Sequence, residues 1–166
     1  MSFIHLGLLV AAGVSLHWVE TLIPVAVAVP GAKLGLANVV TLLVVVAGTP
    51  GQVAALAAAR TLLSSLLQGR LLSLSFWLGL SGGMASALAM VGARRALHKY
   101  LSLVGVSLLG AVTHNLAQLV VLALLVRSPL VFHYLPILLL LAAPSGLLTG
   151  LAAQAVIRRM RLAKDS

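Results

Sequence analysis

The sequence predicts an all-α integral membrane protein, a bundle of about six transmembrane helices. Hydrophobic residues make up 61% of the 166 residues and charged residues only 8%, so a water-soluble globule would have too little polar surface. The apolar runs are long and do not alternate with polar residues as β-barrel strands do, which favours helices. Each span needs about 20 apolar residues, so roughly six spans use up the chain and leave no separate soluble domain.

Turns that contain charged residues, glycine or proline divide the chain, and we expect a single transmembrane domain over residues 1–166. The helices are expected at about 3–22, 34–48, 51–68, 72–93, 103–126 and 131–157, with a short basic tail over 158–166. The first residues lack the basic region of a signal peptide and run directly into apolar sequence. We therefore expect the first helix to be retained.

The connection between the first two predicted helices is irregular by composition. Pro30 and Gly31 precede the second helix, which at 34–48 is short for a full span. Irregular backbone is tolerated at membrane depth only where it is buried in protein or lines a water-filled cavity. We therefore expect a re-entrant or capping loop here. By contrast, the Gly-Thr-Pro-Gly run at 48–51 predicts an ordinary tight turn.

Basic residues are distributed unequally between the two sides of the predicted bundle. Six spans place three basic residues of segment 94–99 and four of the tail on one side, and only Lys33, Arg70 and Arg127 on the other. Cytoplasmic loops carry the excess of Lys and Arg, so both termini are expected in the cytoplasm. The net charge of +9 does not indicate nucleic-acid binding, because the basic residues are scattered between apolar runs.

Small residues spaced four apart mark faces on which helices approach closely. Gly7, Ala11 and Ser15 form such a face on the first helix, and Gly146 and Gly150 form one on the last. Packing inside the bundle is the simpler explanation for any one of them. Docking onto a partner subunit is the alternative, and the first helix is the best candidate for it.

Glu20 is the only acidic residue before Asp165, and it shares a face of the first helix with His17. A carboxylate near hydrocarbon is costly, so it should pair or face water. Two interpretations stay open: an ion pair that locks the first helix to a neighbour, or contact with a ligand or the capping loop. Two side chains are too few for a metal site.

Arg60 lies near the middle of the third predicted helix. An unpaired Arg at this depth costs about 2.5–3.5 kcal/mol, so it needs compensation. A buried pair, with Glu20 as a possible partner, or bonds to backbone carbonyls would supply it. The functional alternative is an anchor for an anionic group of a substrate, which the guanidinium fork fits well.

Polar side chains gather on one face of the fifth predicted helix, where His114, Asn115 and Gln118 are spaced three or four apart. Such groups often form interhelical hydrogen bonds worth about 0.6 kcal/mol each. Three together at the depth of Arg60 favour a polar pocket, to which Ser64 and Ser65 on the third helix would also contribute.

No catalytic set is visible, and we expect no cofactor and no metal. The chain has no cysteine and only two carboxylates, whereas magnesium-dependent phosphoryl chemistry needs several carboxylates and acid–base catalysis needs two titratable groups in reach of each other. Any ATP hydrolysis or prenyl transfer would therefore belong to partner subunits.

Several motifs together resemble a known bacterial membrane family. They are Pro30–Asn38 (PGAKLGLAN), Arg60, the Leu-Ser-Gly-Gly run at 80–83, and the spaced Gly-Ala, His-Asn and Gln of residues 110–118. With them, about residues 5–155 resemble the heptaprenyl diphosphate synthase component I family, also called the Gx transporter family. In size and helix layout this family is similar to the substrate-binding S-components of energy-coupling-factor (ECF) transporters.

The resemblance implies an S-component-like subunit of a bacterial plasma membrane that captures a small anionic or polar metabolite from the outer face. Its partners would be a membrane coupling subunit and ATPases, with Gly7, Ala11 and Ser15 as the docking face. The candidate substrate-binding residues are Glu20, Lys33, Asn38, Arg60, His114, Asn115 and Gln118. The alternative function is a non-catalytic membrane subunit that anchors or regulates a heptaprenyl or polyprenyl diphosphate synthase.

Overall fold

The computed structural model describes residues 2–22 and 35–165, and within these ranges the chain is helical and contains no strand. The all-α prediction is thus confirmed. The capping loop expected between the first two helices, with Lys33, lies outside the described residues. The helices are α1 (Phe3–Leu22), α3 (Leu36–Ala47), α4 (Pro50–Leu67), α5 (Leu74–Ala96), α6 (Leu103–Val126), the short 3₁₀ helix η1 (Pro129–Tyr134) and α7 (Leu135–Asp165).

Four segments of the described chain are long and apolar enough to cross a membrane. They are Phe3–Glu20, Leu74–Ala96, Leu103–Val126 and Pro129–Met160. The other two predicted spans, at 34–48 and 51–68, are not among these four segments, for separate reasons. α4 has 18 residues but includes Gln52 and Arg60, and α3 has only 12 residues. At 1.5 Å per residue α3 is about 18 Å long, too short for a hydrocarbon core of about 30 Å.

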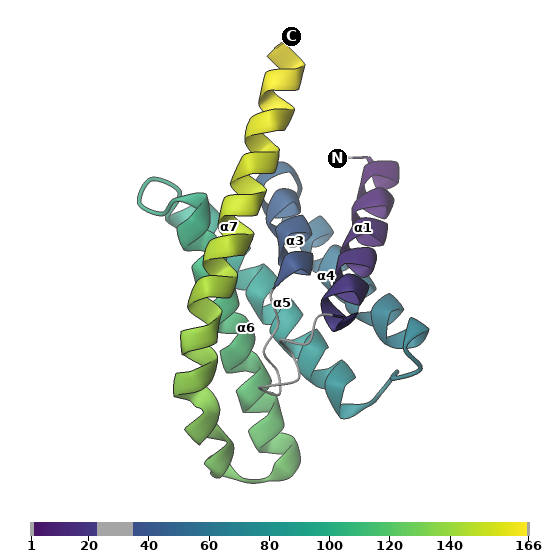
Figure 1. Cartoon of the computed structure of the whole chain (residues 1–166), viewed down its shortest axis with the longest axis vertical. Helices are drawn as coiled ribbons and strands as arrows, with labels where there is room; N and C mark the ends of the chain where they lie inside the picture. Colours follow the sequence, from purple (N-terminus) through teal and green to yellow (C-terminus); the bar gives the residue numbers. More distant parts are fainter. Residues whose placement is uncertain (1, 23–34, 166) are drawn as a thin grey trace.

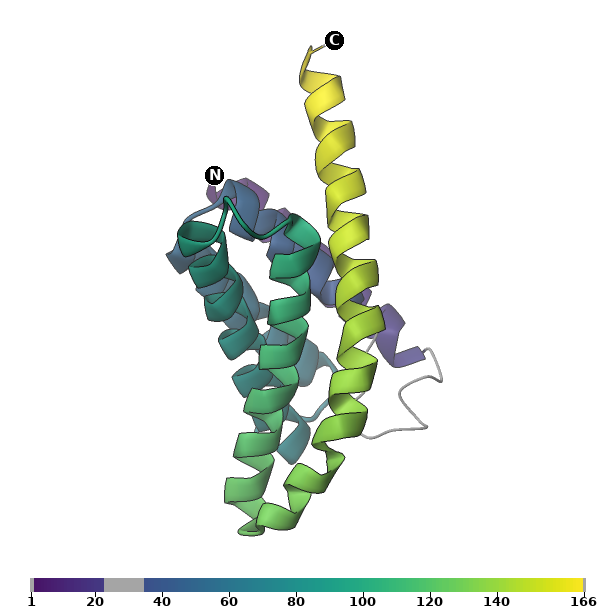
Figure 2. The same cartoon turned by 90° about the vertical axis from the view of Figure 1, so that its left-hand side faces the viewer.

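The helices run up and down between two ends of the molecule (Figures 1 and 2). Both termini and the α5–α6 turn lie at one end, and the α6–α7 turn, which includes Arg127, lies at the other. The end with the termini therefore holds Arg94 and Arg95 of the last turn of α5. These two arginines thus lie at the end where the sequence predicts the excess of basic residues, and the cytoplasmic placement of this end stays a prediction.

α5, α6 and α7 pack side by side, while α1 packs on α3 and α4. Glycines allow the closest approach between α6 and α7. A Cβ atom placed on Gly150 would lie 2.7 Å from the Cα atom of Val104, and one on Gly146 would lie 2.9 Å from the Cα atom of Leu108. The small-residue face of the last helix therefore serves packing inside the bundle.

Local sequence accounts for where the helices begin and end. Thr49 and Gln52 form a reciprocal capping box at the start of α4, and Pro50 occupies its first position. α5 begins at residue 74, and not at 72 as predicted, because Ser73 is its N-cap. The Ser73 hydroxyl accepts a hydrogen bond from the Phe76 N–H. The tail expected over 158–166 is helical as far as Asp165, where α7 ends, since no glycine or proline interrupts the chain after Gly150.

Candidate functional site

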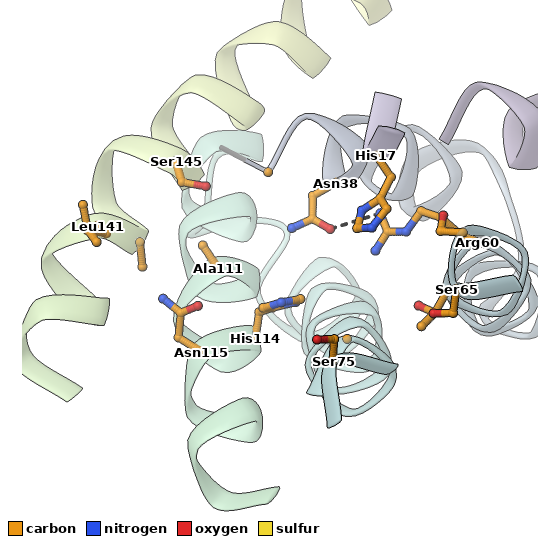
Figure 3. Close-up of a pocket in the computed structure, with 15 residues that line it drawn as sticks. His17, Asn38, Arg60, Ser65, Ser75, Ala111, His114, Asn115, Leu141 and Ser145 are labelled. Atoms are coloured by element: carbon orange, nitrogen blue, oxygen red, sulfur yellow. Dashed lines mark hydrogen bonds between the residues drawn. The ribbon is translucent and has the colours of Figure 1, made fainter. Parts of the chain in front are cut away.

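A pocket lies between the helices of the bundle, and Figure 3 shows the side chains that line it. Its cavity volume is about 70 Å³, well below the roughly 300–1,000 Å³ of typical small-molecule pockets. It therefore has room for a compact polar group. No aspartate or glutamate is among the described residues of its wall. The polar lining side chains are His17, Asn38, Arg60, Thr61, Ser64, Ser65, Ser75, His114, Asn115 and Ser145.

The guanidinium of Arg60 is at the centre of this arrangement, and the residue is only 6% exposed. Its Nη1 atom donates hydrogen bonds to Asn38 Oδ1 and to Thr41 Oγ1, both at 3.3 Å (Figure 3 shows the first). Both acceptors belong to α3, so Arg60 joins α4 to α3. The carboxylate of Glu20, itself 6% exposed, acts electrostatically on the guanidinium from α1. These contacts compensate the charge of Arg60 within the bundle.

Two glycines make room for the Arg60 side chain. A Cβ atom on Gly13 of α1 would lie 3.4 Å from Arg60 Cδ, and one on Gly83 of α5 would lie 3.6 Å from Arg60 Nη2. Any side chain longer than a methyl group at either position would compete with Arg60 for space. Gly83 thus leaves room for the Arg60 side chain, although it is not among the described residues that line the pocket.

Ser64 lies one turn after Arg60 on α4 and is 2% exposed. Its hydroxyl oxygen has no hydrogen-bond partner among the described residues, although it lines the pocket. Leaving such a group buried without a partner costs about 1–3 kcal/mol. By contrast, the Thr61 hydroxyl donates to the carbonyl oxygen of Ala57 at 3.0 Å, within its own helix. Ser65 of the same helix also lines the pocket and is half-buried, so the α4 wall offers two serine hydroxyls.

The N-terminus of α3 forms another part of the wall, through Gly35 and Asn38. Gly35 has a φ angle of +78°, and a Cβ atom there would lie 2.7 Å from Ser145 Oγ. The Thr149 hydroxyl lies 3.2 Å from the carbonyl oxygen of Gly35 and 2.7 Å from that of Ser145, so its one proton is shared between them. α7 thereby fixes where α3 begins.

α6 contributes His114 and Asn115 to the wall opposite Arg60. The side-chain amide of Asn115 donates to the carbonyl oxygen of Leu138 in α7 at 2.8 Å, which holds its orientation. The imidazole of His114 packs tightly against α5, because a Cβ atom on Gly82 would lie 2.9 Å from its Cε1 and Nε2 atoms. The same Cβ would lie 2.9 Å from the Cγ atom of Gln118.

The structure brings together four of the seven candidate substrate-binding residues, namely Asn38, Arg60, His114 and Asn115. Glu20 and Gln118 are buried nearby but are not part of the described lining, and Lys33 lies outside the described residues. Their binding of a ligand stays a prediction. Among the described residues, no group of three or more His, Cys, Asp or Glu could hold a metal ion.

Sequence reasoning missed several contributors to the site: Gly35, Thr41, Ser75, Ser145 and Thr149. The sequence contained a signal for two of them, Thr41 and Ser145. Thr41 is the one hydroxyl residue between Leu36 and Ala47, and Ser145 lies between a proline and a glycine inside the last apolar run. Polar interruptions of apolar helices often face the bundle interior, so both could have been proposed.

The small residues of α1 are exposed, whereas those of α7 pack against α6. Gly7, Ala11 and Ser15 are all exposed, and a Cβ atom on Gly7 would meet nothing within 4 Å. Within the described chain this face therefore packs against no neighbouring helix at Gly7. It is available to lipid or to another protein, and docking stays a prediction.

The comparisons with known proteins give one result. No curated protein and no solved structure matches the chain. The sequence pattern of the family described as heptaprenyl diphosphate synthase component I matches residues 9–156. This range includes every described residue of the pocket wall. The chain therefore belongs to the heptaprenyl diphosphate synthase component I family.

Proposed function

We propose that this protein is a non-catalytic membrane subunit that works with a prenyl diphosphate synthase and holds a small anionic or polar group in its pocket. The observation that carries the proposal is Arg60, buried in a polar wall that has no described carboxylate. A buried guanidinium beside a cavity is suited to an anionic group. Membership of the component I family supports a synthase subunit as the partner.

The small number of carboxylates in this chain indicates which subunit would carry out prenyl transfer. Synthases that transfer prenyl groups must bind magnesium–diphosphate, which requires several oxygen ligands. The chain offers Glu20, which is buried and acts on Arg60, and Asp165 at the far end of α7. Prenyl transfer is therefore assigned to the partner, and anchoring or regulation to this chain.

Two surfaces support an anchoring role. The end with both termini holds Arg94, Arg95, Arg158 and Arg159, which the charge rule places in the cytoplasm, where a soluble synthase would bind. The exposed small-residue face of α1 supplies a second surface, within the membrane.

The experiment that tests the proposal is co-expression of the full chain with a soluble prenyl diphosphate synthase subunit from the same organism. We expect the synthase to be recovered with membranes and to co-purify with the tagged chain in detergent. Arg60→Gln should keep this association and change the activity or product length of the bound synthase. A synthase that stays soluble and equally active in the presence of the chain would contradict the proposal.

A second candidate function is S-component-like capture of a metabolite for ECF-type uptake. The exposed face formed by Gly7, Ala11 and Ser15 favours it, because such a face suits close docking onto a helical coupling subunit. Purification of the tagged chain from native membranes distinguishes the two. Recovery of a membrane coupling protein with ATPases supports capture and uptake, whereas recovery of a synthase alone supports the first proposal.

A further inference from the structure

We propose that α7 carries a binding site for an anionic phospholipid on the part that extends past the other helices. The site is a groove along one face of the helix (the α7 groove), in which Arg158 and Arg159 bind the phosphate head group. None of its lining residues belongs to the pocket around Arg60. The inference therefore goes beyond the proposed function and does not depend on it.

The α7 groove follows one face of a single helix. Its lining residues recur at intervals of three or four positions, so they lie on the same side of α7. Ala153, on the opposite side, is fully buried against the bundle, whereas every residue of the groove is exposed. The groove has a volume of about 570 Å³, within the roughly 300–1,000 Å³ of typical small-molecule sites. It is lined by Leu151, Gln154, Ala155, Arg158, Arg159 and Leu162.

The length of α7 places the two arginines in the head-group layer of a bilayer. α7 starts at Leu135, at the end of the molecule opposite the termini (Figure 1). Arg158 follows 23 residues later, which corresponds to about 35 Å at 1.5 Å per residue. The hydrocarbon core is about 30 Å thick, and the head groups extend the bilayer to about 40–45 Å. With Leu135 at one edge of the core, Ala155 lies at the opposite edge, and Arg158 and Arg159 lie just beyond it.

Tyr100 marks the same level from the neighbouring helix connection. Gly150 of α7 faces Val104 of α6, because a Cβ atom on Gly150 would lie 2.7 Å from the Val104 Cα atom. The two helices are antiparallel (Figure 2). Four residues further along α7 and four residues back along the other segment, Gln154 is therefore level with Tyr100. Tyr100 is 85% exposed, and tyrosines are enriched at the membrane–water interface. The groove thus begins at this interface.

The charge of the groove selects an anionic head group. Arg158 and Arg159 are the only charged residues of its lining, and no aspartate or glutamate occurs within four positions of either one in the sequence. Of the two carboxylate residues of the chain, Glu20 is buried in the bundle and Asp165 is at the end of α7. A guanidinium fork binds phosphate oxygens with two parallel hydrogen bonds. A phosphodiester head group therefore fits the two arginines.

The polarity of the groove changes along its length in the same direction as that of a phospholipid. Leu151 and Ala155 are apolar and lie on the side of the hydrocarbon core, while the arginines lie on the side of the water. A lipid can contact both parts at once. A soluble protein would reach the arginines but not Leu151, which lies at hydrocarbon depth. The groove as a whole therefore fits a lipid better than a soluble partner.

The test is native mass spectrometry of the purified full chain in detergent, titrated with phosphatidylglycerol or with phosphatidylcholine. We expect one phosphatidylglycerol per chain to bind at least about fivefold more tightly than phosphatidylcholine, because one basic residue near an anionic surface contributes about that factor. Equal binding of the two lipids would overturn the proposal. Inorganic phosphate in excess should not displace the lipid. Displacement by phosphate would identify a soluble anion as the ligand and would also overturn it.

Arginine variants test whether the groove, and not the general charge of this end, selects the lipid. Arg158→Gln with Arg159→Gln should remove the preference for phosphatidylglycerol. Arg94→Gln with Arg95→Gln is the control, because it removes the same charge at the same end of the molecule. α5 packs on α6, and α6 packs on α7, so these two arginines lie outside the groove (Figure 2). An equal loss of preference in both double variants would contradict a discrete site.

Alanine variants test the groove without changing its charge. Ala155→Phe fills the groove and should abolish the bound lipid at concentrations at which the wild type holds one. Ala152→Phe is the control, since Ala152 is also exposed on α7 but does not line the groove. Both variants should unfold at the wild-type temperature, because exposed positions tolerate substitution. Retention of the lipid by Ala155→Phe would overturn the assignment of the groove.

Co-purification of the synthase with the same variants separates a lipid occupant from a protein occupant. We expect the arginine pair of α7 to be needed for lipid binding whether or not a synthase is present. If Arg158→Gln with Arg159→Gln keeps phosphatidylglycerol and loses the synthase, the groove binds protein and the lipid assignment is wrong. If it loses the lipid and keeps the synthase, the lipid site stands and the proposed function is unaffected.

Discussion

The hydroxyl of Thr149 on α7 lies 3.2 Å from the carbonyl oxygen of Gly35, 114 residues earlier in the chain. This contact joins the last helix to the start of α3, and the same helix α3 accepts hydrogen bonds from Arg60 at Asn38 and Thr41. Two segments that are distant in sequence thus meet at the wall of the pocket, where Gly35 and Ser145 both line it.

Gly35→Ala is expected to destabilise the chain by about 1–3 kcal/mol, because alanine is strained at positive φ and overpacks Ser145. The added Cβ would lie 2.7 Å from Ser145 Oγ. Gly69→Ala is the matched control, since Gly69 has a φ of +62° but open space around it. Thermal unfolding in detergent measures both. Equal losses for the two variants would show that the contact with Ser145 contributes nothing.

Arg60→Met should destabilise the bundle by roughly 3 kcal/mol, because it removes the positive charge that acts on the buried Glu20 carboxylate. Glu20→Gln in the same background should restore part of this loss. The expected coupling energy is about 0.5–3 kcal/mol in a double-mutant cycle. The measurement is unfolding by denaturant in mixed micelles. Strictly additive effects would mean that the two residues stabilise the fold independently.

Gly150→Ala should destabilise the α6–α7 contact by about 1–3 kcal/mol through overpacking. The new methyl group would lie 2.7 Å from a backbone atom, the Cα of Val104, and a backbone atom cannot move aside cheaply. Gly92→Ala serves as the control in α5, where a Cβ would meet nothing within 4 Å, and it should be neutral or slightly stabilising. Unfolding temperatures of the two variants should therefore shift in different directions or by clearly different amounts.

Gly7→Leu should leave the stability of the isolated chain within about 0.5 kcal/mol of the wild type, since the substitution is on an exposed helix face. If α1 docks onto a membrane partner, the same variant should lose that partner during purification, because close helix approach needs small residues. Leu8→Ala, at an exposed position beside it, is the control. Retention of the partner by Gly7→Leu would exclude this face as the docking surface.

Much of this fold could be predicted because membrane-spanning helices can be recognised from the length of their apolar runs. Thr49, Pro50 and Gln52 mark the start of α4 by capping chemistry alone. Asn38, Arg60, His114 and Asn115 could be singled out as site residues because polar groups inside apolar helices are costly. Each of these inferences uses only local sequence.

The rest depends on how helices are placed against one another. Gln118 shares a helix face with His114 and packs on Gly82 as closely as His114 does, yet only His114 is part of the described lining. Ser145 and Thr149 enter the site because α7 crosses the start of α3. No periodicity within one helix contains this information.

α7 is a single helix of 31 residues despite Pro144, which corresponds to about 46 Å at 1.5 Å per residue. Its middle carries Ser145 and Thr149 at the pocket, and its last turns carry Arg158 and Arg159 past the other helices (Figure 2). A helix that is continuous over this length transmits rotation and tilt along its axis. A protein bound to the basic end would therefore contact the same continuous helix that holds the start of α3.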